Sequence, residues 1–127
     1  MPKKNLPRPT DAELSILRVL WLRGSSTVRQ VQEELGEDTG YTTVLKFLQI
    51  MTEKGLVTRE DSQRTHVFRA SIPEEETQRQ LVTDLLDRAF RGSAKNLVLQ
   101  ALSAKKASAA ELAEIRKLLD EMSRGQR

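Results

Sequence analysis

The sequence has no cysteine, one histidine and few aromatic residues, and these shortages exclude several kinds of protein. Without cysteine there can be no disulfide, no thiolate metal ligand and no cysteine nucleophile. With His66 as the sole histidine, a multi-histidine metal site is excluded as well. A glycine-rich phosphate loop is also missing. We therefore expect a protein that is not an enzyme and that uses no metal or other cofactor.

Long apolar runs are missing too, because no stretch approaches the length of a membrane span or of a secretory signal. The expectation is a soluble protein of the cytoplasm with no membrane insertion. Aromatic residues make up 4% of the chain and charged residues 31%, so the core must be mainly aliphatic. The 127 residues allow one modest domain, or a small domain with a helical appendage. A net charge of +3 permits a nucleic-acid partner without requiring one.

The segment Gly40–Gly55 has the pattern of a helix that is apolar on one side. The apolar positions recur at helical spacing and are Val44, Phe47, Leu48 and Met51. The opposite face carries Thr42, Thr43, Lys46, Gln49 and Glu53. Hydroxyl, amide and ammonium groups can bind base edges and phosphates in a major groove, which favours a recognition helix. The alternative is a polar face that is merely solvated.

Two shorter helices are predicted before this segment. Capping boxes open them at Thr10–Glu13 and Thr27–Gln30, and a polar turn at residues 36–40 leads into the third helix. Helices joined by such a turn form a helix-turn-helix. We expect Trp21, in the first helix, to be the largest piece of the core. Tyr41, in the first turn of the third helix, either reaches a phosphate with its hydroxyl or packs over the turn.

Extended chain is predicted after the third helix, at residues 56–60 and 65–70, which are rich in β-branched and aromatic residues. The polar segment 61–64 between them suits a hairpin turn. Three helices followed by a hairpin form a winged helix, and Arg64 and Thr65 lie where the tip of the wing can reach DNA. A phosphate contact and a merely solvated or structural role remain alternatives for Arg59, Arg69 and His66.

The remaining segments flank this predicted domain, which covers residues 10–72. Residues 1–9 hold three of the four prolines and several basic residues, so we expect a flexible basic arm. Such an arm either follows a phosphate backbone or is only a disordered terminus. Pro73 cannot extend a sheet ladder but suits the first turn of a helix, and it begins a helical domain at residues 73–127.

Three helices are predicted in this second domain. The first ends near Phe90, the second covers Ser93–Ser103, and the third begins at Ser108. They carry more apolar surface than three short helices can bury among themselves. The commonest partner for such a surface is a second copy of the chain. The positions that we expect at the dimer interface are Leu81, Leu85, Phe90, Leu97, Val98, Leu102, Leu112, Ile115 and Leu119.

Taken in order, these motifs resemble the penicillinase-repressor family of bacterial transcription factors, the BlaI/MecI/CopY type, over residues 8–123. The segments that carry the resemblance are Thr10–Leu14 with Val19–Trp21, Tyr41–Val44 with Glu53–Val57, and Arg64–Phe68. The resemblance implies a homodimer that represses a resistance or stress operon by occupying a palindromic operator on double-stranded DNA. It places Thr42, Thr43 and Lys46 at the DNA and Arg64 in the wing.

The resemblance also implies a mode of regulation. In β-lactam-responsive members a membrane sensor protease triggers cleavage within the fifth helix, and the matching bond here joins Gln100 to Ala101. Those members carry Asn-Phe at this bond. Copper-responsive members carry cysteines for the metal, and this chain has none, which argues against control by copper.

The alternative function is a winged-helix module that binds a protein and makes no specific contact with DNA.

Overall fold

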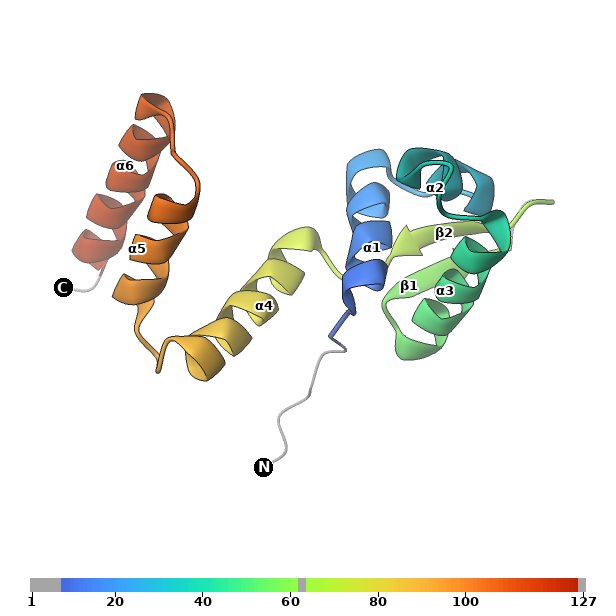
Figure 1. Cartoon of the computed structure of the whole chain (residues 1–127), viewed down its shortest axis with the longest axis horizontal. Helices are drawn as coiled ribbons and strands as arrows, with labels where there is room; N and C mark the ends of the chain where they lie inside the picture. The colour runs from blue at the N-terminus through green and yellow to red at the C-terminus, as the bar shows by residue number, and fades with distance from the viewer. Residues whose placement is uncertain (1–7, 62–63, 126–127) are drawn as a thin grey trace. The chain divides into compact units, whose positions relative to one another are not determined.

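The computed structural model describes residues 8–61 and 64–125, and over these residues the chain is mainly α-helical with one small antiparallel sheet (Figure 1). The predicted fold class, a winged helix-turn-helix followed by three further helices, is confirmed. The chain divides into two compact units, one ending at Thr83 and the other beginning at Asp84. The functional limits at residues 72 and 73 stay a prediction, and the expected basic arm lies mostly outside the described residues.

Helices α1 (Asp11–Arg23) and α2 (Val28–Leu35) begin at the predicted capping boxes. In each box the threonine hydroxyl accepts a hydrogen bond from the backbone N–H three residues later, and that residue's side chain accepts one from the threonine N–H. The two bonds between Thr10 and Glu13 are 3.2 and 2.9 Å long. The corresponding bonds at Thr27 are 3.1 and 2.9 Å long.

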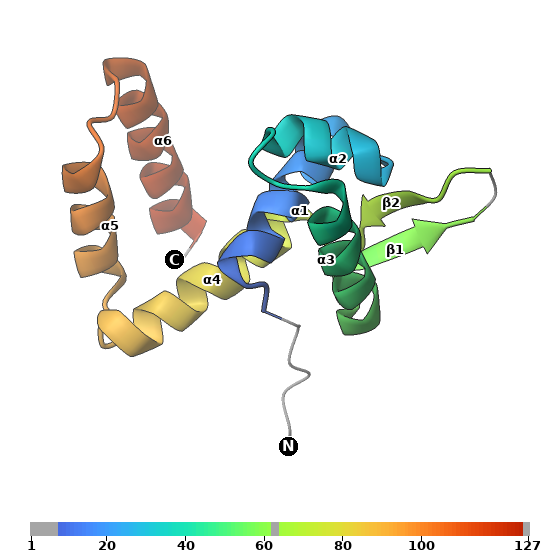
Figure 2. The ribbon, with the colours of Figure 1, turned by 45° about the vertical axis from the view of Figure 1, so that its right-hand side comes forward.

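Helix α3 (Tyr41–Lys54) is the predicted recognition helix, and its C-terminal end is set by glycine. The φ angle of Gly55 is 82°, a left-handed conformation that side chains with a Cβ atom rarely adopt. Within the first unit, α2 and the hairpin flank α3 (Figure 2). Helix α3 is therefore bordered by two other elements.

Strands β1 (Val57–Glu60) and β2 (Val67–Ala70) pair antiparallel, with Arg59 opposite Phe68. Residues directly opposite each other share one face of the sheet, and successive residues alternate between the faces. Arg59 therefore lies on the face that buries Phe68, and Arg69 lies on the other face. Ser26, just before α2, also bridges Phe68 through backbone hydrogen bonds of 2.9 and 2.8 Å.

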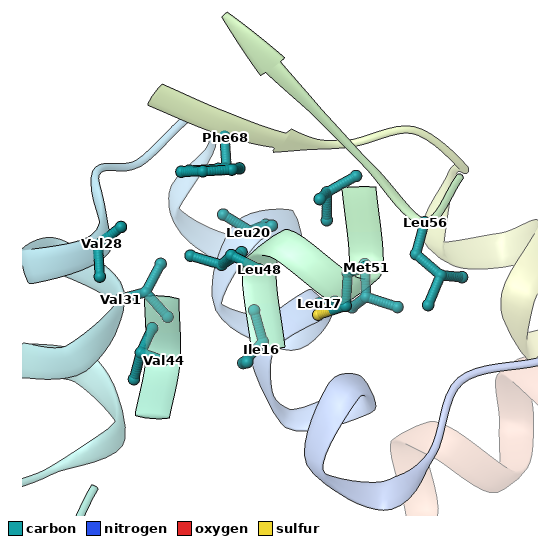
Figure 3. Packing of buried hydrophobic residues seen from close by; sticks show 11 residues of the cluster. Ile16, Leu17, Leu20, Val28, Val31, Val44, Leu48, Met51, Leu56 and Phe68 are labelled. Carbon is teal, nitrogen blue, oxygen red and sulfur yellow. The ribbon is translucent and has the colours of Figure 1, made fainter. Parts of the chain in front are cut away.

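The core of the first unit is mainly aliphatic, as its composition predicts (Figure 3). Its buried members are Ile16, Leu17, Leu20, Val28, Val31, Val44, Leu48, Met51, Leu56, Val57 and Phe68. The expectation that Trp21 is the largest piece of this core is wrong, because Trp21 is only half-buried at its edge. From there its Nε1–H donates a hydrogen bond of 2.9 Å to the Ile72 carbonyl, which a fully apolar site could not supply.

The carboxylate of Glu13 is buried in the first unit, with 2% of the residue exposed. Its Oε1 accepts hydrogen bonds from the Thr10 N–H at 2.9 Å and from the Lys54 Nζ at 2.7 Å. The start of α1 is thereby joined to the end of α3. Burial alone would raise the pKa of Glu13, but the bonds from Lys54 and Thr10 and the charge of Lys54 outweigh burial. The pKa of Glu13 consequently lies below its ordinary value.

A Glu13→Gln variant is expected to lose about 1–3 kcal/mol of unfolding free energy at pH 7, because it replaces the buried charged hydrogen bond with Lys54 by a neutral one. Folding lowers the pKa of Glu13, so its stabilisation is present above the unfolded-state pKa and is lost as pH falls through the folded-state pKa. Urea unfolding at pH 7 and in acid measures the difference. The difference in unfolding free energy between wild type and Glu13→Gln should become smaller in acid. The control Glu53→Gln, at an exposed position, should unfold like wild type at both pH values. A difference for Glu13→Gln that does not change with pH would contradict this account.

The second unit holds the end of α4 (Glu74–Ala89) together with α5 (Ala94–Ala104) and α6 (Ala109–Gly125). These bounds agree with the predicted helices to within about one residue. Neither α5 nor α6 contains a buried residue. The exposed large apolar side chains of this unit are Leu85, Val98, Leu99, Leu102, Leu112, Leu118, Leu119 and Met122. The three helices therefore leave their apolar surface largely uncovered.

Candidate nucleic-acid interface

The polar face of α3 is exposed. Its exposed residues are Thr42, Thr43, Lys46, Gln49 and Glu53. Val44, Leu48 and Met51 on the opposite side are each 0% exposed, so the apolar stripe is anchored in the core. Phe47, which was expected in that stripe, is only half-buried, because it lies at the stripe's edge. Ile50 is 37% exposed and interrupts the polar face.

A cleft of about 800 Å³ lies beside α3 and draws on three parts of the winged helix. Its lining residues are Thr27, Val28, Arg29, Tyr41, Leu45, Gln49, Arg59, Arg64, Thr65, His66 and Phe68. Four of the predicted DNA-binding residues meet here, namely Tyr41, Gln49, Arg64 and Thr65. Tyr41 is 46% exposed, which leaves part of its surface accessible from the cleft. Arg29 from α2 and Arg59 and Arg64 from the hairpin make the cleft cationic.

Arg29 was not predicted as a site residue, although the sequence offers a signal for it. It is the second residue of α2, directly behind the Thr27 cap. The positive end of a helix dipole disfavours a cation in the first turn, and no acidic residue stands in the first turn of α2. Arg29 therefore does not stabilise its own helix, and its place beside α3 favours a role in binding.

Asp61, which directly follows β1, contacts side chains on both sides of the hairpin connection. Its Oδ1 lies 2.9 Å from Arg59 Nε and 2.8 Å from His66 Nδ1, so one carboxylate holds two cleft residues. Arg69 is paired instead with Glu60, at 3.1 Å between Nε and Oε1, on the opposite face of the hairpin. The two strand arginines are thus separated, with Arg59 lining the cleft and Arg69 turned away from it.

A second hollow, of about 490 Å³, lies on α3 itself. It is lined by Thr42, Thr43, Lys46, Phe47 and Ile50. The predicted DNA-binding residues therefore fall into two groups. Thr42, Thr43 and Lys46 border this hollow, and the other four border the cationic cleft.

Neither a metal-binding cluster nor a membrane-spanning helix is found in the described part of the chain. Within residues 8–61 and 64–125 no group of three or more histidine, aspartate or glutamate side chains could bind a metal ion. In the same part of the chain no helix is both long enough and apolar enough to span a membrane. The exposed polar and cationic surface of the winged helix is the candidate site.

Comparisons with known proteins agree with this architecture. The sequence model of the penicillinase repressor family matches residues 9–121. The penicillinase repressor of Bacillus licheniformis is 26% identical over 120 residues, which cover 93% of this chain and 94% of that protein. The transcriptional regulator BlaI of Mycobacterium tuberculosis is 33% identical over 97 residues, covering 74% and 70%. A transcriptional regulator from Thermotoga maritima shares the fold, with a TM-score of 0.52 and 19% identity over 91% of this chain and 77% of its own.

Proposed function

The chain belongs to the penicillinase repressor family, and from this premise we propose that it is a homodimeric repressor that occupies a palindromic operator. The observation that carries the proposal is the exposed polar face of α3 beside a cleft with three arginines. A major groove about 12 Å wide admits one α-helix, whose exposed side chains then meet base edges. The target is proposed to be the promoter of a resistance or stress operon.

The side chains divide into two roles under this proposal. Thr42, Thr43, Lys46 and Gln49 enter the groove from α3 and contact base edges or the adjoining backbone. Phosphates are contacted from the two sides of α3. The residues assigned to them are Tyr41, Arg64 and Thr65, with Arg59, for which the sequence left a phosphate contact open, and the newly identified Arg29.

The proposed homodimer rests on the second unit. Burying a fully exposed leucine or valine side chain is worth about 1.5–3 kcal/mol, and several of these side chains on α5 and α6 are 36–57% exposed, so each would contribute part of that value. A second copy of the same surface would bury them. The dimer would also tether two winged helices, each on a half-site about 34–36 Å from the other.

A sensor protease is proposed to relieve repression by cutting the chain within α5, and this cut requires the helix to unwind locally. The candidate bond, Gln100–Ala101, lies inside α5, and both residues are exposed. A protease binds its substrate in extended form, so α5 must unwind locally before this bond is cut. Any such cleavage would separate α6 from the winged helix.

The test is a salt series with purified protein and its own upstream DNA, with scrambled DNA as control. If Arg29, Lys46, Arg59 and Arg64 contact phosphates in both protomers, log affinity should fall with log salt at a slope of about −7. Between 50 and 200 mM salt this slope amounts to a loss of about 10⁴-fold. Equal and weak binding to both DNAs would contradict a specific repressor and favour a protein partner.

A further inference from the structure

We propose that the hollow on α3 is a methyl-binding recess that reads thymine, with Ile50 as its specificity-determining residue. This inference rests on the proposed DNA-binding function and adds the base feature that the helix selects. The recess of about 490 Å³ is bordered by apolar groups from Thr43, Phe47 and Ile50 and by the cation of Lys46. Ile50 is 37% exposed, so a large part of its side chain is open to a ligand.

The position of Ile50 on the helix is not explained by packing. Val44, Leu48 and Met51 are the fully buried core residues of α3, each 0% exposed, and the half-buried Phe47 packs against the same core. Thr43, Phe47 and Ile50 follow one another at i, i+4 and i+7, so they form a strip along the helix that adjoins the core at Phe47. This strip combines a threonine methyl, an aromatic ring and a branched aliphatic side chain within the polar face.

The chemistry of the major groove identifies the occupant. Among the four bases, thymine alone presents an apolar group in that groove, its C5-methyl. Lys46 on the recess and the three arginines in the neighbouring cleft make the surroundings cationic, which suits a polyanion better than an apolar protein segment. From Thr42 to Ile50 the helix rises about 12 Å, a length comparable to the groove's width.

The experiment begins with selection of binding sites from a random-sequence duplex library by the full-length wild-type protein. In the selected duplex each thymine is then replaced in turn by deoxyuridine, which lacks only the C5-methyl. At one or more positions the substitution should weaken wild-type binding about fourfold, the value of one buried methyl group. Ile50→Ala changes both protomers, so it should lose about this factor in each half-site of the thymine duplex, or about 16-fold in all, and nothing further on a duplex with deoxyuridine in both half-sites.

Leu22→Ala is the matched control, because Leu22 is an exposed aliphatic residue, 88% accessible, on α1. It should bind like wild type and keep the full response to deoxyuridine. Wild-type binding that is unchanged by every deoxyuridine would overturn the inference, as would an equal response in Ile50→Ala. A library from which the wild-type protein enriches no sequence would instead overturn the proposed DNA-binding function, and the recess with it.

Discussion

A Thr43→Ala, Lys46→Ala double variant is expected to bind operator DNA no more tightly than scrambled DNA. Removing the Thr43 contact and the Lys46 cation, at about 1 kcal/mol or more each, costs at least about 2 kcal/mol, or about 30-fold, in each half-site. The dimer would suffer this loss in both half-sites. Titration of labelled operator and scrambled duplexes at one salt concentration measures the effect.

The fold should survive these substitutions. Both residues are exposed on α3, and alanine has the highest helix propensity, so the free energy of unfolding should change by about 0.5 kcal/mol or less. Thermal unfolding followed by circular dichroism tests this. The matched control is Ser15→Ala, Arg18→Ala, an exposed hydroxyl and cation with the same i, i+3 spacing on α1. Operator affinity that survives in the α3 variant would show that another surface binds the DNA.

The first unit could be predicted well from sequence where the signals are local. The hydroxyl of Thr10 or Thr27 acts on a backbone N–H three residues away, and Gly55 sets its own φ angle. Such determinants require no knowledge of the tertiary structure. The apolar period of α3 likewise identified Val44, Leu48 and Met51 as buried, because one face of a helix must pack on the core.

Features that depend on distant segments could not be predicted in this way. The cationic cleft joins Arg29 of α2 to Arg59 and Arg64 of the hairpin, and nothing in the sequence measures that proximity. Arg59 and Arg69 both stand in predicted strands, yet the register of β1 with β2 puts them on opposite faces. The backbone bridge from Ser26 to Phe68 is a single pair, too short to leave a strand pattern.

The exposed Ile50 illustrates a different limit. Helical periodicity assigns residues to an inner or an outer face, and it treats an apolar residue outside the main stripe as noise. The structure shows instead that Ile50 borders a hollow together with Thr43 and Phe47. Recognition sites need such departures from simple amphipathic patterns, because the ligand itself presents both polar and apolar groups.

The second large effect is expected from Leu119→Glu, which should convert the proposed dimer into a monomer. Leu119 is 56% exposed on α6 and shares a stripe with other apolar residues at helical spacing. These residues are Leu112, Ile115 and Met122. By symmetry, a homodimer would carry the new carboxylate twice in one apolar interface, and burying an unpaired charge there is far costlier than burying leucine.

DNA affinity should fall with the loss of the dimer. Two tethered winged helices bind the second half-site at a high effective concentration, and this advantage is worth about 10²–10⁴-fold. Leu119→Glu should therefore lose about that factor on the full operator and none on a half-site duplex. The Thr43→Ala, Lys46→Ala variant should weaken on both duplexes, so the two variants separate base contact from tethering.

Sedimentation measures the oligomeric state, and Leu22→Glu provides the control. Leu22 is 88% exposed on α1, outside the second unit, so a glutamate there should leave the dimer intact. The free energy of unfolding of the winged helix should be unchanged in both variants, because neither leucine is buried within its own unit. If Leu119→Glu still sediments as a dimer, the interface must lie elsewhere, and the exposed apolar surface of α5 and α6 must serve a different partner.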